Sequence, residues 1–545
     1  MKKIIVFIIL AFSLSITAGG ASDFAKSRML YEDTGMFILT HPVENSRVTT
    51  SSRMSFLGTA DNAYPLYING EEIGTTALGF FSYYAELMLG ENTFVFINGD
   101  NIESIVITRE APGQWIPPVT EYFGIELYGS TENNYISRFA NLNDDLYGRT
   151  PLVRGTTFRI LAEHGDFYII EDGTAVFKHS VFQLEWLIPP ITVSGGEVNA
   201  GENSVSLSFN VTDNPLYEII LDENKAVLLL YAAHDELDII IPDGAFITAA
   251  EKIPHDSVLC YEFTFEREPV GFIVDFSEGK MNVKFRFAAV SLSDVFVLLD
   301  AGHGGHLPGA VGPPGDYGPM EKDLNLYVAE VAQNYLEALG VRTLLIRDRD
   351  EDVPILERVA FFDMEPDISV CIHANSMPLS SDFSSERGPL MFITLDLSEE
   401  AVDGMIRIIA EETGNEYVPP KRQNFAMARY TGAPSMLFEM GFMCNPEEYE
   451  IMITLDYLDK MGEAVGMSVM QYLGLTDNEQ LTIDNVQLPM EPEPPVEEED
   501  EEEPPLIQTS GMGDSLVFGR YTILLASVFV AGVALCAPSV LRRKK

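Results

Sequence analysis

Residues 294–305 have the sequence Asp294-Val-Phe-Val-Leu-Leu-Asp300-Ala-Gly-His303-Gly-Gly, in which an apolar run ends in a polar, glycine-rich segment. An apolar run of this kind is typical of a strand that is buried on both faces of a parallel sheet. A segment with helical periodicity follows and ends at Gly340. Further strands are predicted at 341–346, 368–372, 390–394 and 435–438, and further helices at 355–362, 399–412 and 455–473. Because strands alternate with helices, residues 294–474 are predicted to form an α/β domain with a mostly parallel sheet.

Polar side chains lie at the expected carboxyl ends of three of these strands, which is the edge where such sheets bind ligands. His303 follows the first strand, His373 and Asn375 follow the third, and Glu439 ends a later one. Glu321 begins the helix after the first strand and can reach the same edge. The sequence therefore predicts that two histidines and two carboxylates meet at one rim of the sheet.

This set of residue types indicates a catalytic zinc site. Two neutral imidazoles and one carboxylate suit zinc, with a fourth position left for water. Zinc lowers the pKa of such a water to about 7, so that hydroxide is available at neutral pH. A second carboxylate can then take the proton and pass it to a leaving amine. Glu321 fits the ligand role and Glu439 the acid–base role, although the residue types alone also allow the opposite assignment.

At these residues the sequence resembles the zinc-dependent N-acetylmuramoyl-L-alanine amidases of the type-3 family. The matching motifs are Leu299-Asp-Ala-Gly-His-Gly-Gly305, Glu321-Lys-Asp-Leu-Asn-Leu326, Ser369-Val-Cys-Ile-His-Ala-Asn375 and Leu437-Phe-Glu-Met-Gly-Phe442, with Arg347 and Leu356-Glu-Arg358. The resemblance covers residues 294–474, about one third of the chain. It implies zinc bound by His303, Glu321 and His373, and Glu439 as the catalytic carboxylate. It also implies hydrolysis of the amide that joins N-acetylmuramic acid to the L-alanine of peptidoglycan.

Two loop positions depart from the family's pattern. Leu307 stands where the family usually has an acidic residue, and Gly388-Pro389-Leu390 replaces a Gly-x-Glu sequence. Neither departure removes a metal ligand, but both affect loops that bear on substrate choice. We expect Asn375, Arg387 and Arg429 to contact the substrate, the two arginines through a peptide carboxylate. An ordinary surface position is the alternative for each arginine.

The N-terminal half is predicted to be rich in β structure, because short apolar runs alternate with turn signals. Residues 25–112 resemble the Ig-like sandwiches of bacterial surface proteins, with Asn69-Gly70 as a hairpin turn. Residues 118–190 resemble a bacterial SH3-like barrel, and residues 192–291 alternate like another β-sandwich. These three units contain no catalytic constellation. For the SH3-like unit, binding of cell-wall peptides and a spacer role are the two alternatives.

The N-terminus has the features of a secretory signal peptide. Two lysines precede an apolar run at 4–16, and small residues follow up to Ala21. This order of charged, apolar and small residues predicts a signal peptide at 1–21. An uncleaved N-terminal anchor is the alternative.

The C-terminus has the features of a membrane anchor. Residues 521–541 carry no charge and, at about 1.5 Å per residue, are long enough to cross a bilayer as a helix. Residues 542–545 are all basic, which predicts that they lie in the cytoplasm. Residues 475–520 are acidic and proline-rich and are expected to form an extended stalk. The chain is therefore expected to be a single-pass cell-membrane protein whose catalytic region lies on the extracytoplasmic, cell-wall side.

Composition excludes several other classes of protein. The 545 residues include 34 Lys and Arg against 83 Asp and Glu, a net charge of −49. Such an acidic chain is not expected to bind nucleic acid, because phosphate binding requires a basic surface. Four scattered cysteines are too few for a disulfide scaffold. The leading interpretation is a membrane-tethered zinc amidase that cuts peptidoglycan. The alternatives are a zinc peptidase that acts on stem peptides and a catalytically inactive surface-binding or scaffold protein.

Overall fold

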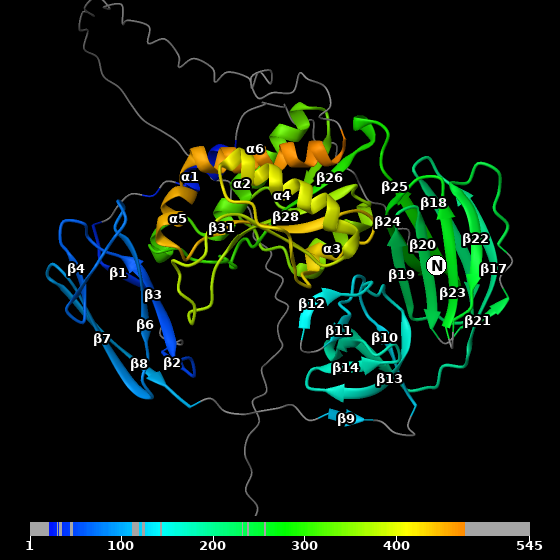
Figure 1. The fold of residues 1–545 in the computed structure, drawn as a ribbon, viewed down its shortest axis with the longest axis horizontal. Helices are drawn as coiled ribbons and strands as arrows, with labels where there is room; N and C mark the ends of the chain where they lie inside the picture. Colours follow the sequence, from blue (N-terminus) through cyan, green and yellow to red (C-terminus); the bar gives the residue numbers. More distant parts are fainter. Residues whose placement is uncertain are drawn as a thin grey trace, which may run out of the picture. The chain divides into compact units, whose positions relative to one another are not determined.

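A computed structural model describes residues 21–29, 31, 35–43, 47–111, 119–121, 126–141, 144–231, 233–236, 239–255 and 258–474 (Figure 1). Residues 1–20 of the predicted signal peptide, the stalk, the predicted membrane span and the basic tail lie outside this set. Among the described residues, no helix combines the length and the apolar character needed to cross a membrane. The three β units and the α/β domain belong to one compact unit, residues 1–490.

The first β unit consists of two sheets. One has the strand order β1-β3-β6 and the other has the order β2-β8-β7-β4-β5. The strands are β1 (Ile38–His41), β2 (Val48–Thr49), β3 (Arg53–Thr59), β4 (Leu66–Ile68), β5 (Glu71–Ile73), β6 (Phe80–Glu86), β7 (Gly90–Asn98) and β8 (Asn101–Arg109). The predicted hairpin turn is confirmed, because Asn69 and Gly70 join β4 to β5 with φ of 50° and 85°.

The second β unit is a single sheet with the order β12-β11-β15-β14-β13-β10-β16, and β9 pairs with β13. Its strands are β9 (Val119–Glu121), β10 (Leu127–Thr131), β11 (Phe139–Asn141), β12 (Asp144–Gly148), β13 (Thr157–His164), β14 (Phe167–Ile170), β15 (Ala175–Phe177) and β16 (Val181–Leu184). All described pairs in it are antiparallel.

The third β unit has two sheets, β21-β17-β18-β25-β24 and β19-β20-β23-β22. Its strands are β17 (Ile191–Ala200), β18 (Ser204–Val211), β19 (Tyr217–Asp222), β20 (Lys225–Tyr231), β21 (Ala233–Glu236), β22 (Ile247–Ile253), β23 (Val258–Phe265), β24 (Pro269–Ser277) and β25 (Lys280–Phe287). Alternate residues of β18 and β20 are buried in one shared cluster, as expected when two sheets pack face to face. The likeness of the first two units to Ig-like and SH3-like domains remains a prediction.

The predicted α/β domain is confirmed. Its six-stranded sheet has the order β27-β26-β28-β31-β29-β30, and the four strands β27, β26, β28 and β31 are parallel. The strands are β26 (Phe296–Ala301), β27 (Arg342–Leu345), β28 (Ile368–Asn375), β29 (Leu390–Ile393), β30 (Lys421–Arg422) and β31 (Ser435–Phe442). The helices are α2 (Glu321–Ala338), α3 (Ile355–Ala360), α4 (Glu399–Thr413), α5 (Pro446–Met452) and α6 (Leu455–Tyr472).

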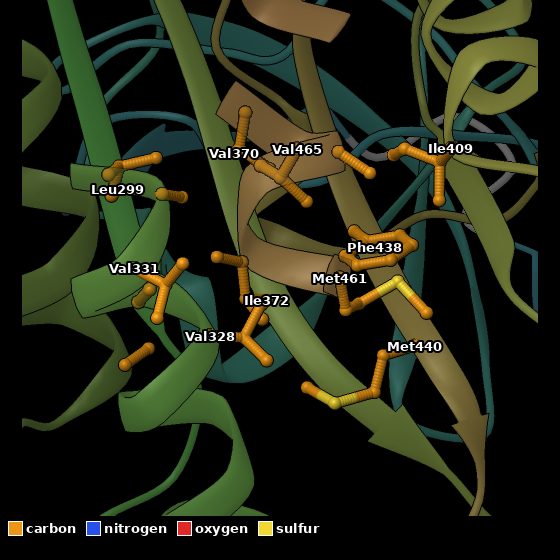
Figure 2. Close-up of a cluster of buried hydrophobic side chains, with 14 of the residues drawn as sticks. Leu299, Val328, Val331, Val370, Ile372, Ile409, Phe438, Met440, Met461 and Val465 are labelled. Carbon is orange, nitrogen blue, oxygen red and sulfur yellow. The ribbon is translucent and has the colours of Figure 1, made fainter. Parts of the chain in front are cut away.

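Alternation along the strands divides the sheet into two faces. One face contributes Val370, Ile372 and Phe438 to a core that it shares with α2, α4 and α6 (Figure 2). The other face carries Cys371 and Leu437, which pack with residues near α3. Because successive side chains of a strand point to opposite faces, the side chains of Asp300, His373 and Glu439 belong to this second face. The large helical core thus supports the sheet from one side and leaves the polar strand ends on the other.

A short helix precedes the first β unit and packs on the α/β domain. Helix α1 (Asp23–Arg28) overlaps the start of the β unit predicted at residues 25–112. The Ser22 backbone N–H donates to Glu330 over 2.6 Å, and Arg28 pairs with Asp323 over 2.8 Å. Both carboxylates lie on α2. A helix of six residues is marginal alone, so these contacts are what make it stable.

Candidate metal centre

The first predicted ligand, His303, lies in a tight turn directly after β26. His303, Gly304 and Gly305 all have positive φ, of 59°, 131° and 55°. This region costs a residue with a side chain about 1–2 kcal/mol, so neighbouring contacts must hold His303 in place. The turn places the His303 ring next to the ring of His373, with ring centroids 4.8 Å apart.

Two buried arginines hold the backbone of this turn. Arg347 donates to the carbonyl groups of Ala301 and Gly302 over 2.7 and 2.9 Å. Arg358 donates to the carbonyl groups of Ala301 and His303 over 2.9 and 2.5 Å. Burial, reinforced by the charge of Arg358, lowers the pKa of Arg347 to about 10. Through these hydrogen bonds, the two guanidinium groups provide donors for the backbone carbonyl groups at and just after the end of β26.

Glu321, the second predicted ligand, is the first residue of α2. One carboxylate oxygen, Oε2, accepts the Ala310 N–H over 2.5 Å. The other, Oε1, lies 2.8 Å from His373 Nδ1 and 3.1 Å from His303 Nε2. Burial opposes ionisation, but the hydrogen bonds with the two histidines bring the pKa of Glu321 well below its usual range. The residue is therefore an ionised carboxylate directed at two imidazoles.

The third predicted ligand, His373, lies near the end of β28 and completes the cluster. One donor atom from each of His303, Glu321 and His373 lies within 4.8 Å of the others. Two imidazole nitrogens and one carboxylate oxygen form a donor set that fits catalytic zinc with one position left open. The residues present therefore fit the metal that the sequence predicts.

Two glycines make this close approach possible. A Cβ atom on Gly302 would lie 2.3 Å from His373 Nε2, and one on Gly309 would lie 2.3 Å from Glu321 Oε2. Gly309 also has φ of 74°, which disfavours any other residue. Neither position can carry a side chain unless a ligand residue moves.

Glu439 lies beside the cluster on β31. It is opposite His373 in the parallel register of β28 and β31, so both side chains lie on the same face of the sheet. Glu439 Oε2 is buried and has no hydrogen-bond partner among the described residues. Burial, and to a smaller extent the charge of Glu321, raises the pKa of Glu439 well above its usual range. An unpartnered carboxyl group with a raised pKa is suited to proton transfer.

A cavity of about 560 Å³ gives access to these residues and is lined by His303, Glu321, His373, Asn375 and Glu439, among others. Of the residues predicted to contact substrate, Asn375 thus reaches the cavity. Arg387 and Arg429 are not among the described residues that line it. Arg387 is exposed and lies 3.9 Å from Glu447, whereas Arg429 donates to Asn424.

Two further residues near the site are Glu448, for which the sequence predicted no role, and Cys371, which was predicted to be a packing residue. Glu448 is buried and accepts the N–H groups of Gly388 and Phe442, so it ties the loop before β29 to the end of β31. Cys371 lines the cavity, and its thiol donates to Asp300 over 3.0 Å. The predicted packing role of Cys371 agrees with its burial, while its bond to Asp300 is visible only in the structure.

A second cavity, of about 960 Å³, lies elsewhere in the molecule. Its lining residues come from the second and third β units and the segment between them, and include Tyr128, Glu171 and Tyr231. It contains none of the predicted site residues. The α/β domain therefore holds the candidate centre, although the larger cavity is in the β-rich half.

Sequence comparison agrees with this location of the centre. Residues 297–471 match the family described as N-acetylmuramoyl-L-alanine amidase. This part of the chain is therefore similar to that family. The uncharacterized protein YqiI of Bacillus subtilis is 29% identical over 195 residues, which are 34% of this chain and 88% of YqiI. The amidase AmiC of Neisseria meningitidis is 26% identical over 32% of this chain and 52% of its own length. A germination-specific amidase of B. subtilis is 25% identical over 34% of this chain and 82% of its own length.

Solved structures match the same share of the chain. The catalytic domain of the amidase CwlV from Bacillus (Paenibacillus) polymyxa var. colistinus is 26% identical, with a TM-score of 0.31, over 33% of this chain and 99% of that one. The amidase AmiC2 of Nostoc punctiforme is 27% identical, with a TM-score of 0.31, over 33% of this chain and 97% of that one. The sequence matches to named amidases cover about one third of the protein.

Proposed function

We propose that this protein is a zinc-dependent amidase that hydrolyses the bond between N-acetylmuramic acid and L-alanine in peptidoglycan. The observation that carries the proposal is the cluster of His303, Glu321 and His373 beside the unpartnered carboxyl group of Glu439. This cluster lies within the domain that matches the amidase family. A decayed site would be expected to lack a member of this set, so the arrangement supports an active enzyme.

The residues of the centre have two roles in the proposed reaction, metal binding and proton transfer. When bound by His303, Glu321 and His373, zinc would supply a Lewis acid and lower the pKa of water. Glu439 accepts a proton from the attacking water at Oε2, the atom that has no partner in the described protein. It then donates this proton to the nitrogen of L-alanine as the amide bond breaks. The proton balance closes, since one water is consumed and a carboxyl group and an amine are released.

The walls of the cavity suit a substrate of mixed polarity. Leu307, Val353 and Ile355 provide an apolar side, and Asn375 provides an amide that can hydrogen-bond a peptide or a sugar. Leu307 and Ile355 are exposed at the rim. We propose that the apolar side receives the methyl groups next to the scissile amide, while Asn375 orients its polar groups.

A zinc peptidase that acts on stem peptides is the second candidate, because the same residues can hydrolyse a peptide bond. Both candidates use the same metal centre. The amidase cleaves the bond between N-acetylmuramic acid and L-alanine, whereas the peptidase cleaves a bond within the stem peptide. The family match favours the amidase.

The proposal is tested with purified full-length protein, peptidoglycan and a chelator. We expect soluble stem peptides to be released, release to stop with chelator, and zinc to restore it. Glu439→Gln should bind zinc as well as the wild type but lower the rate by at least about 10²-fold, the lower range for loss of a general acid–base. Zinc-loaded wild-type protein that releases no peptide would refute the proposed activity.

We further propose that the enzyme acts on the cell-wall side of the membrane and is anchored by residues 521–541. The charge pattern of the two chain ends supports this arrangement. Protease added to intact cells should cut the acidic stalk and release a soluble, active fragment. Activity that remains inside intact, protease-treated cells would refute this location.

A further inference from the structure

Two loops connect the ligand residues of the candidate metal centre to the rest of the α/β domain. The first loop, residues 304–320, lies between the first histidine ligand and the carboxylate ligand. The second loop, residues 376–388, begins shortly after the second histidine ligand. Leu307 of the first loop and Ser376 of the second line the cavity. The conformations of both loops therefore affect how a substrate fits the cleft.

The first β unit binds three consecutive carbonyl groups of the second loop. The backbone N–H of Ser55 donates to Leu379 over 2.7 Å, and its hydroxyl donates to Ser381 over 2.7 Å. The hydroxyl of Tyr84 donates to Ser380 over 3.0 Å. Ser55 and Tyr84 are directly opposite each other in the β3–β6 register. One pair of facing residues thus holds the middle of the loop.

The strand order of the first β unit explains why β3 is available for this contact. Strand β1 ends at His41, which is opposite Leu57 of β3. Ser55 lies two residues before Leu57, so its N–H points toward the same edge of the strand. An edge of this kind is a template for pairing with another segment. In this structure Leu379 of the second loop occupies it.

The contact is buried and is shared between two hydrophobic cores. Ser55 and Leu57 are completely buried. Leu57 belongs to the same apolar cluster as Phe383 of the second loop. Leu379 packs against this cluster and also against the core of the first β unit. The loop is therefore built into the first β unit and does not merely touch its surface.

The first β unit also contacts the first loop. The Thr40 hydroxyl donates to the Pro313 carbonyl over 2.5 Å. Phe80 of β6 packs edge to face on Tyr449, with ring centroids 5.4 Å apart. The Tyr449 hydroxyl in turn donates to the carbonyl of Pro319 over 2.8 Å. The same β unit thus holds both loops that flank the candidate metal centre.

We propose that the first β unit is a brace for the cleft, and that Ser55 and Tyr84 are positioning residues that hold the second loop in its substrate-binding conformation. A loop that is ordered before substrate arrives lowers the entropy cost of binding. The expected change in KM rests on the proposed amidase function, whereas the expected change in the order of the second loop is independent of it.

The test uses full-length protein in which the two hydroxyl groups are removed, Ser55→Ala/Tyr84→Phe. The matched control is Ser82→Ala/Tyr83→Phe, which removes the same groups from neighbouring positions of β6 for which the structure describes no bond to either loop. Hydrogen–deuterium exchange of residues 376–388 is measured first. Each lost bond of about 1 kcal/mol corresponds to about fivefold faster exchange, so the double variant should exchange roughly 25-fold faster in this loop. The control should match the wild type.

Steady-state kinetics on a soluble muropeptide provide the second readout. The test variant should raise KM at least about twofold and change kcat less, whereas the control should change neither. Loop exchange equal to that of the control would overturn the brace, and faster exchange with an unchanged KM would overturn the positioning role. If wild-type protein proves inactive, faster exchange still supports the brace while the proposed function fails.

Discussion

At the scale of single residues, the candidate centre depends on backbone positions that allow close approach. Gly309 has no room for a side chain, because a Cβ atom would lie 2.3 Å from Glu321 Oε2. We expect Gly309→Ala to lower zinc affinity at least tenfold, measured by competition with a chromogenic chelator. Gly340→Ala is the matched control, since Gly340 has a similar φ of 87° but nothing within 4 Å of the added atom. In both variants, backbone strain should lower the free energy of unfolding by about 1–2 kcal/mol. Only Gly309→Ala should also bind zinc more weakly. Equal metal affinity in the two variants would contradict this geometry.

The buried pair of Arg358 and Asp300 gives a second prediction. Arg358 bonds to Asp300 and also holds the carbonyl of His303, while Asp300 is fully buried. Arg358→Met leaves an uncompensated carboxylate, which should cost about 3–5 kcal/mol in thermal or chemical unfolding. The double variant Arg358→Met/Asp300→Asn should recover part of this loss, because it removes both charges. Additive losses would show that the two residues do not act as a pair.

At this scale the sequence predicted a role for the residues that end strands, whereas Arg347 and Arg358 were only part of matching motifs and received no role. His303, His373 and Glu439 were found because the carboxyl ends of parallel strands meet at one edge. The buried role of Arg347 is not visible in the sequence, because arginine is ordinarily a surface residue. Arg387 is exposed and does not line the cavity, and the N–H of the next residue, Gly388, donates to Glu448 over 2.6 Å.

At the scale of elements, the packing of α2 against α6 depends on a glycine. A Cβ atom on Gly462 of α6 would lie 2.5 Å from Val331 Cβ of α2. Replacing a helical glycine with alanine ordinarily stabilises a helix by about 0.5–1 kcal/mol. Gly462→Ala should instead destabilise the domain by about 1–3 kcal/mol through overpacking. Gly404→Ala in α4, where nothing lies within 4 Å, should have the ordinary stabilising effect. If Gly462→Ala and Gly404→Ala shift the melting temperature in the same direction, the close packing of α2 against α6 would be contradicted.

Most elements of the α/β domain could be predicted, including the six-residue helix α3, but helix α5 and strand β30 could not. The strand predicted at 368–372 is β28, and the predicted helix at 399–412 is α4. Helix α1 was also not predicted, and a strand of two residues such as β30 carries too little periodicity to be recognised. Contacts with the rest of the protein make these short elements stable. The pairing of Arg28 with Asp323 is one example.

At the scale of the whole molecule, the β units pack on the α/β domain through buried polar contacts. Arg286 of β25 donates to the carbonyl groups of Pro366 and Gly432 over 2.6 and 3.1 Å, and to the Tyr430 hydroxyl over 2.9 Å. The N–H of Phe272 donates to the Thr431 carbonyl over 2.7 Å. A fragment of residues 290–475 loses these partners and exposes the apolar surface beneath them. We therefore expect its melting temperature to lie below that of the same domain in the full chain. Equal melting temperatures would contradict the shared interface.

The contacts between units could not be predicted from the sequence. Alternation along a strand shows that one face is buried but not against which partner. Leu57 illustrates this, since its position fits an ordinary sandwich core while its cluster belongs largely to the α/β domain. The sequence was therefore enough to locate the units along the chain. The contacts of the first β unit with the two cleft loops became visible only in the structure.

In the proposed reaction, His303, Glu321, His373 and Glu439 hydrolyse the amide between N-acetylmuramic acid and L-alanine. The most direct measurement is mass spectrometry of the products that full-length, zinc-loaded protein releases from a defined muropeptide. We expect a stem peptide with a free L-alanine amino group and a sugar product with a free lactyl carboxyl group. Cleavage within the stem peptide, with L-alanine still attached to the sugar, would contradict it, as would an intact muropeptide.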